Sequence, residues 1–238
     1  MLIQSLVRTK SSVVAACLVL FMITPTADAK SGPENRLDAA TSILEESLNG
    51  ADRGIPSSLL DRAHCVGVFP SVVKGALLIG GRYGKGVVTC RVKDSSWSAP
   101  VNFKIEGGNV GLQVGGSATD IVLVFLGKNG VKRLMRTGFT IGVDGAAAAG
   151  PVGRTASGQV DALFGAEIAT YSRSRGLFVG VSLDGATLRL AHNANKKLYA
   201  GWGPYPKRIL QGEIPPTLPA LPFLDVLRKY SPERRVSD

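Results

Sequence analysis

The chain has little of the chemistry on which catalysis and metal binding most often depend. Histidine occurs twice in 238 residues, at His64 and His192, and cysteine occurs three times. No Gly-x-Ser-x-Gly motif is present, which argues against a hydrolase with a nucleophile elbow. The sequence gives no sign of a zinc site, because it has no Cys-x-x-Cys motif and no second histidine close to the first. Four scattered aspartates stand mostly near turns, where aspartate commonly caps or forms the turn: Asp120, Asp144, Asp161 and Asp184. We therefore expect no enzymatic activity, no metal and no cofactor.

Charged residues are also few. They make up 19% of the chain, against 45% hydrophobic residues, a balance that excludes a disordered protein. The length suits one domain with appendages and is ample for a buried core. Glycine, with 29 residues, far outnumbers phenylalanine, with 8, and this predicts many tight turns and short strands.

A hydrophobic run long enough to cross a bilayer is missing from the N-terminus. Arg8 and Lys10 precede an apolar run over Val13–Ile23, which is about ten residues and too short to span. Ala27-Asp28-Ala29 then places small residues at the spacing that signal peptidase cleaves. These features predict a secretory signal over residues 1–29.

A lipoprotein anchor is a competing interpretation of the same segment. Val14-Ala15-Ala16-Cys17 resembles a bacterial lipobox, in which Cys17 would be lipidated. Against it, only six residues separate Lys10 from Cys17, and the apolar run continues beyond the cysteine. Both interpretations predict export to a periplasm or cell envelope, either as a free mature chain or anchored at Cys17.

The charge that remains after export is strongly positive. Without residues 1–29 the chain keeps 26 of its 28 basic and 17 of its 18 acidic residues, a net charge of about +9. For an exported protein this charge favours anionic surfaces such as phospholipid headgroups or polyanionic glycans, and no nucleic acid is expected. Solubility alone would also explain the charge.

Two cysteines remain in the mature chain, Cys65 and Cys90. Both lie in strand-like segments, so adjacent strands could bring them within bonding distance in an oxidising compartment. The alternative is a pair of buried thiols.

Local patterns predict an α+β fold, a single domain with an antiparallel β core of the meander or barrel-like sandwich type. An amphipathic helix with an acidic polar face is expected from about Glu34 to Asn49. Short β-like runs are expected at Cys65–Phe69, Ala76–Ile79, Gly86–Val92, Val101–Ile105, Val110–Val114, Ile121–Phe125, Ile168–Ser172, Phe178–Leu183 and Ala186–Leu190. Short helices are expected at Pro56–His64, Val131–Met135, Gln159–Glu167, Ala191–Leu198 and Phe223–Tyr230. We expect the domain over residues 30–205 and a proline-rich tail with a short helix over 206–238.

Arg82 and Lys85 are the first candidate binding residues. They lie in the run Gly80–Gly86, which fails the P-loop pattern because Ile79 stands where the first glycine should be and Gly86 follows the lysine. Between two strand-like runs it is interpreted as a hairpin with both cations at its tip. They either contact a phosphate or are simply solvated.

Arg173 and Arg175 form a second candidate pair. Two residues apart on a strand, they project to one face while Ser172 and Ser174 project to the other. Two guanidinium groups on one face could bind a phosphate by bidentate hydrogen bonds, or could protect an exposed sheet edge by their charge. Arg154 either joins them or pairs with an aspartate.

A set of motifs in one fixed order resembles the SYLF domain family over about residues 36–205. The motifs are Val68-Phe69-Pro70, Gly80-Gly81, Gly84-x-Gly86-Val87-Val88, Trp97-Ser98-x-Pro100, Gly111-x-Gln113-x-Gly115, Ala148-Ala149-Gly150-Pro151-x-Gly153-Arg154, Tyr171–Phe178 and Asn195-x-x-x-Tyr199. The resemblance implies a lipid-binding domain without catalysis, as in exported bacterial members. Eukaryotic members bind phosphoinositides or other anionic phospholipids, and some bind actin filaments. Because this sequence has a predicted secretory signal and no SH3 or FYVE module, actin is not expected as a partner.

Two functional hypotheses follow. The first is non-enzymatic binding of anionic phospholipid at a membrane surface, with headgroup contacts from five cations: Arg82, Lys85, Arg154, Arg173 and Arg175. The alternative is a structural or protein-interaction module of the envelope with no lipid ligand. Clustering discriminates between them, because a headgroup site requires the five cations to converge on one face near an apolar opening.

Overall fold

A computed structural model describes most of residues 32–231, which belong to one compact unit, Ser31–Asp238. The described ranges are 32–49, 54–76, 79–92, 96–110, 115–135, 138–152, 163, 165–174, 177–203 and 205–231. The predicted export signal over residues 1–29 and the alternative lipidation at Cys17 lie outside these residues.

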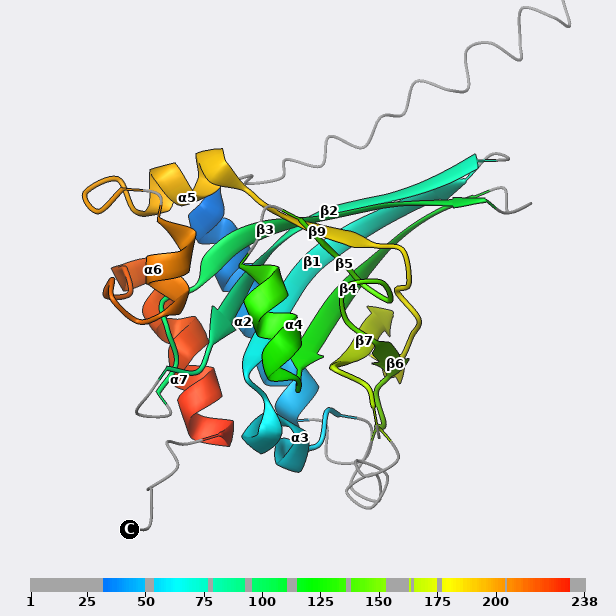
Figure 1. Cartoon of the computed structure of the whole chain (residues 1–238), viewed down its shortest axis with the longest axis horizontal. Helices are drawn as coiled ribbons and strands as arrows, with labels where there is room; N and C mark the ends of the chain where they lie inside the picture. Colours follow the sequence, from blue (N-terminus) through cyan, green and yellow to red (C-terminus); the bar gives the residue numbers. More distant parts are fainter. Residues whose placement is uncertain are drawn as a thin grey trace, which may run out of the picture. The chain divides into compact units, whose positions relative to one another are not determined.

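The described residues form one curled sheet with helices around it (Figure 1). Its strands are β1 Cys65–Ala76, β2 Ile79–Cys90, β3 Val101–Val110, β4 Gly115–Phe125, β5 Phe139–Thr140, β6 Ala147–Ala149, β7 Ile168–Ser174, β8 Leu177–Gly180 and β9 Thr187–Leu190. Their order is β5-β9-β3-β2-β1-β4-β7-β6, with β8 paired to β7. All pairs between these strands are antiparallel except β6–β7. The predicted α+β fold with an antiparallel core is therefore confirmed, and the parallel pair at one edge makes the sheet mixed.

The glycine-rich run Gly80–Gly86 is not a hairpin. It lies within β2, which continues from Ile79 to Cys90 and pairs with β1 on one side and β3 on the other. Its glycines serve close packing: a Cβ at Gly84 would lie 2.6 Å from a methyl carbon of Val72. At Gly86 it would lie 2.5 Å from the Phe69 ring, and closer still to a carbonyl oxygen of β1. The short strand expected at Gly86–Val92 is therefore part of a longer strand, β2, which packs closely against β1.

Other predicted elements fall in or next to undescribed segments. The Ala76–Ile79 run is not a separate strand: β1 ends at Ala76 and β2 begins at Ile79, with residues 77–78 outside the described part of the chain. Residues 111–114 of the Val110–Val114 run, and most of Gln159–Glu167, also lie outside it.

The helices cover the sheet and close the core. They are α2 Pro33–Asn49, α3 Ser57–Arg62, α4 Lys128–Leu134, α5 His192–Leu198, α6 Pro206–Leu210, the 3-10 turn η2 Leu218–Ala220 and α7 Leu221–Tyr230. The first helix, α2, packs on β1 and β2 and contacts α5 and α7. Its buried positions include Leu37, Ala40 and Leu44, the three- and four-residue spacing expected of an amphipathic helix.

The C-terminal segment packs into the same core. Phe223, Leu224 and Leu227 of α7 are fully buried, and α7 lies against α2. Beyond α7, the Ser231 hydroxyl donates to Asp61 over 3.0 Å. The Tyr230 hydroxyl also bonds the Asn49 side chain at the end of α2. The helices α2 and α7 are thus joined by apolar packing and by the Tyr230–Asn49 contact, and Ser231 links the end of α7 to α3.

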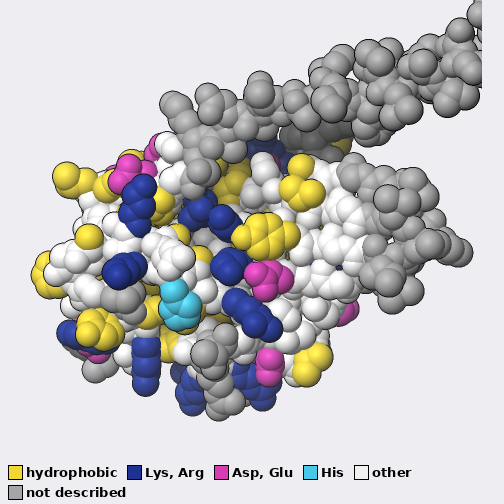
Figure 2. Space-filling model, turned by 90° about the horizontal axis from the view of Figure 1, so that it is seen from above, with side chains coloured by type: hydrophobic (Ala, Val, Ile, Leu, Met, Phe, Trp, Pro, Cys, Tyr) yellow, Lys and Arg dark blue, Asp and Glu magenta, His cyan; other side chains and the backbone are white. Residues whose placement is uncertain are grey.

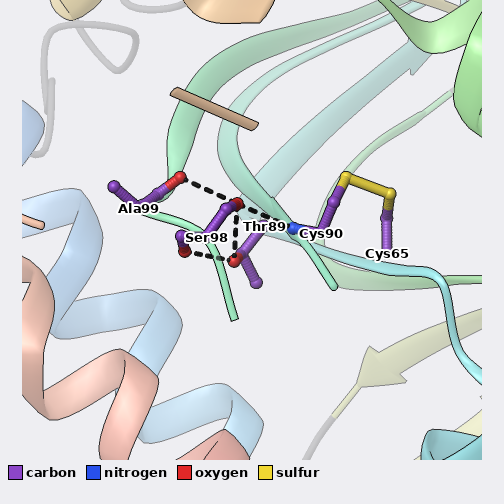
Figure 3. The surroundings of a disulfide bond; sticks show 5 residues. All are labelled: Cys65, Thr89, Cys90, Ser98 and Ala99. Atoms are coloured by element: carbon purple, nitrogen blue, oxygen red, sulfur yellow. Dashed lines mark hydrogen bonds between the residues drawn. A yellow bond between two sulfur atoms is a disulfide. The ribbon is translucent and has the colours of Figure 1, made fainter. Parts of the chain in front are cut away.

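A disulfide joins Cys65 at the start of β1 to Cys90 at the end of β2, two residues that face each other in the sheet (Figure 3). Buried hydroxyls hold the same strand end. The Thr89 hydroxyl donates to the Ser98 carbonyl over 2.6 Å, and the Ser98 hydroxyl accepts from the Cys90 amide over 3.1 Å. The Trp97-Ser98-x-Pro100 motif therefore has a structural role at this end of the sheet.

Replacing both Cys65 and Cys90 with alanine should lower the free energy of unfolding by about 3 kcal/mol, because the bond closes a loop with a sequence separation of 25 residues in the unfolded chain. Urea denaturation of the oxidised protein and the double variant measures the difference. Addition of a reductant should leave the variant unchanged. Equal midpoints for the two oxidised proteins would contradict the prediction.

Candidate functional site

The sheet separates two of the cations that the sequence analysis grouped together. Arg82 and Lys85 are three residues apart on β2, and side chains alternate along a strand, so they project to opposite faces. Arg82 stands opposite Lys74 of β1, and Lys85 stands opposite Lys104 of β3. Each lines a different cavity. A shared phosphate site at a hairpin tip, as the sequence suggested, is therefore not what the structure shows.

Arg173 on β7 is held by two carboxylates. Its guanidinium lies 2.9 Å from Glu46 of α2 and 3.7 Å from Asp120 of β4. Asp120 also accepts a hydrogen bond of 2.9 Å from the Ser71 amide. Ser71 is in the left-handed region, with φ of 48°, at the bend of β1. Arg173 thus links the end of α2 to the bent part of the sheet, and its charge is compensated.

The five predicted headgroup contacts do not form one described cluster. Arg154 and Arg175 lie outside the described residues. Of the other three, Arg82 lines one face of the sheet together with Ser172, while Lys85 and Arg173 project from the opposite face. The alternation of Ser172 and Arg173 is as expected from strand geometry.

A basic cleft of ≈ 690 Å³ gathers cations that the sequence analysis did not connect. It lies between the start of α2, the outer face of β2 and β3, and α5. Four Lys and Arg side chains line it, with one histidine and one tyrosine: Arg36, Lys85, Lys104, Lys197, His192 and Tyr83. Figure 2 shows basic side chains gathered around a histidine on the upper face of the molecule.

Local structure explains why these cations meet. Lys85 and Lys104 are directly opposite across β2 and β3, an arrangement of like charges that destabilises a sheet. The carboxylate of Glu106 partly offsets it, at 3.7 Å from Lys104 and 3.8 Å from Arg189. The cleft remains positive because no acidic residue is among its described lining residues.

The base of the cleft is held by buried amides. Asn102 on β3 accepts a hydrogen bond of 2.5 Å from Arg36, which fixes the first turn of α2 against the sheet. Asn195 of α5 is fully buried. Its side-chain oxygen accepts a hydrogen bond of 2.7 Å from the backbone N–H of Asn102, and its side-chain nitrogen donates one of 2.9 Å to the backbone carbonyl of Asn102. Burial lowers the pKa of the Arg36 guanidinium, although arginine remains protonated.

Tyr199, four residues after Asn195, extends this arrangement. Its hydroxyl donates to the Pro100 carbonyl over 2.5 Å, and burial raises the pKa of this phenol, which keeps it a neutral donor. The Asn195-x-x-x-Tyr199 motif therefore binds α5 to β3 and positions Lys197 and His192 at the cleft.

Part of this cleft could have been found from the sequence. Lys85 is a candidate binding residue from the sequence and Lys104 lies in an expected strand, so a pairing between their two strands would place them side by side. Arg36 and Lys197 belong to helices at opposite ends of the chain, and only the tertiary fold brings them together.

The described residues offer little for other kinds of site. They contain no group of three or more His, Cys, Asp or Glu side chains that could hold a metal ion. Within the same part of the chain, no helix is both long and apolar enough to cross a membrane.

Comparison with known protein families shows to which family this chain belongs. Residues 106–230 match the Ysc84 family, described as "Las17-binding protein actin regulator". The chain belongs to this family. It is the SYLF family that the sequence motifs indicated, so the resemblance is confirmed.

Curated relatives extend the match toward the N-terminus. "LAS seventeen-binding protein 3" of Saccharomyces cerevisiae (strain ATCC 204508 / S288c) is 35% identical over 202 residues, 84% of this chain and 44% of its own length. "SH3 domain-containing YSC84-like protein 1" of Homo sapiens is 36% identical over 166 residues, 67% of this chain and 48% of its own. The Mus musculus protein of that name is 33% identical over 198 residues, which cover 81% of this chain and 58% of its own length. The Ysc84-family chain thus spans about half the length of these relatives.

These names correct the expected partners. The motifs and the charge of the sequence predict binding of anionic phospholipid, and the predicted signal and missing SH3 module argue against actin as a partner. The family description names Las17 binding and actin regulation, and the relatives are named for protein binding and an SH3 domain. The descriptions therefore point to protein partners, and the family is by name a binding family.

Proposed function

We propose that this Ysc84-family chain is a non-enzymatic protein-interaction module, and that its basic cleft binds an acidic surface of a protein partner. The observation that carries the proposal is the convergence of four cations from separate parts of the chain on one cleft: Arg36, Lys85, Lys104 and Lys197. Such a surface attracts an acidic partner and accelerates its association.

The composition of the cleft supports a protein partner. Tyr83 lies among the cations and is 46% exposed, and tyrosine is enriched among residues that dominate binding energies at protein interfaces. The Asn102–Asn195 hydrogen bonds fix the surrounding elements before binding. A rigid basic surface loses less conformational entropy when a partner binds than a flexible one.

Filamentous actin is the partner to test first, because the family description names an actin regulator. The predicted export signal stays a separate prediction, so the experiment uses residues 30–238 as purified protein. Binding through a basic cleft should weaken as salt is raised, since exposed charges are screened over about 8 Å at physiological ionic strength.

Reversing the charge of Lys85 and Lys197 to glutamate should weaken co-sedimentation with actin filaments by about ten-fold or more, because each change adds repulsion to a lost attraction. Lys197→Glu alone should also weaken binding, and its matched control is Lys196→Glu, the same single change on α5 at an exposed lysine that does not line the cleft. The control should retain wild-type affinity.

Two results would contradict the proposal. One is an equal loss in the control and the cleft variant, which would reduce the effect to net charge. The other is a wild-type protein that ignores filaments but sediments with vesicles containing phosphatidylserine. Circular dichroism and thermal unfolding of each variant should show that the fold is retained.

A further inference from the structure

A second cavity, on the opposite face of the sheet from Lys85, has a different chemistry. It has a volume of ≈ 270 Å³ and is lined by two cations, Lys74 and Arg82, and by the hydroxyls of Ser117, Thr119 and Ser172. The side chains of Val72, Ile121 and Leu183 supply an apolar part of the wall. No carboxylate is among its described lining residues.

The two cations of this cavity are poorly compensated. Lys74 and Arg82 stand directly opposite each other on β1 and β2, where like charges destabilise the pairing. Neither forms an ion pair with a carboxylate within the described part of the chain. The Nη1 atom of Arg82 is buried without a hydrogen-bond partner, and burial lowers the pKa of this guanidinium.

Such an arrangement is costly unless something binds to it. A buried donor without an acceptor costs about 1–3 kcal/mol, and more when the donor is charged. An anion between Lys74 and Arg82 would pair with the guanidinium and remove the like-charge repulsion together. The three hydroxyls, none of them engaged with another described residue, could complete the coordination of its oxygen atoms.

The wall of the cavity is fixed in place. Val181 donates its amide to the Thr170 carbonyl over 3.2 Å, and its own carbonyl accepts from the Thr170 hydroxyl. Ser182 donates to Asp184 over 2.7 Å, so its hydroxyl is already used. The Arg82 stem runs beside Gly107, where an added Cβ would lie 3.4 Å from Arg82 Cγ.

We propose that this cavity binds a small organic anion, a phosphate monoester or a carboxylate with a short apolar group. Arg82 and Lys74 hold the anionic group, and Val72, Ile121 and Leu183 contact the apolar part. The volume lies just below the range of about 300–1,000 Å³ typical of small-molecule sites, which favours a ligand of few atoms. This site is separate from the basic cleft, so either proposal can fail without the other.

Isothermal titration calorimetry of residues 30–238 with butyl phosphate, butyrate and inorganic phosphate tests the site, with sodium chloride at equal ionic strength as the reference. Saturable binding of at least one of the three anions is expected. Arg82→Gln should weaken it ten-fold or more, and Lys74→Gln several-fold. Lys196→Gln, the same change at an exposed lysine that lines neither cavity, should have no effect.

Arg82→Lys distinguishes a lost ligand contact from a lost fold, because it keeps the charge and should bind more tightly than Arg82→Gln. The proposal is overturned if no anion gives saturable heat, or if Arg82→Gln binds as the wild type does. Binding to phosphatidic acid vesicles that depends on Arg82, with no response to any soluble anion, would also overturn it.

Discussion

Replacing Gly86 with alanine should destabilise the fold by about 3 kcal/mol or more, or prevent folding altogether. The added Cβ would lie 2.5 Å from two atoms of the Phe69 ring and would also overlap the Val68 carbonyl oxygen. Backbone and a fully buried ring cannot both move aside, because Phe69 is packed in the core. Chemical denaturation measures the loss, and the yield of folded protein reports complete failure.

Gly81→Ala is the matched control on the same strand. Its Cβ would meet only the Gly107 carbonyl oxygen, at 3.8 Å, an ordinary contact. Alanine should therefore be tolerated there, with a change in unfolding free energy within about 0.5 kcal/mol. Equal stability of the two variants would show that β1 and β2 do not approach each other as closely as described.

Replacing Asn195 with alanine should lower the unfolding free energy by about 3 kcal/mol. The change removes the acceptor of the buried Asn102 amide and the donor to the Asn102 carbonyl. The Asn102 backbone carbonyl still accepts a hydrogen bond of 3.0 Å from the Ala191 backbone N–H, but the Asn102 backbone N–H loses its acceptor. Thermal and urea unfolding give the magnitude, and hydrogen exchange at the Asn102 amide should become faster.

The neighbouring Asn193→Ala provides the control for this experiment. Asn193 is exposed on the same helix and lines the basic cleft without a hydrogen bond to another described residue. Its replacement should leave stability and the exchange rate at Asn102 unchanged. If Asn195→Ala alters neither quantity, α5 is not fastened to β3 through this amide pair.

Local periodicity was sufficient to predict most elements but not their extent. The spacing of Leu37, Ala40 and Leu44 predicted α2 correctly, because a helix face is encoded in neighbouring residues. The interpretation of Gly80–Gly86 as a hairpin was wrong, because glycine permits both a turn and close contact between strands. Which of these applies depends on Val72 and Phe69, and their position relative to β2 depends on the bend of β1.

The candidate sites show the same limit. Residue type identified Arg82 and Lys85, but grouping them required knowing that residues 80–86 are extended, which sends the two side chains to opposite faces. The compensation of Arg173 by Glu46 could not be predicted, since 127 positions separate these two residues and only packing brings them together.

The contact between α2 and α7 has a consequence for how this chain is made. Synthesis proceeds from the N-terminus, so α2 is complete long before Phe223, Leu224 and Leu227 leave the ribosome. Until then the apolar face of α2 lacks part of its covering, and the native domain cannot close. Until α7 has been translated, the uncovered apolar face of α2 is therefore exposed to aggregation.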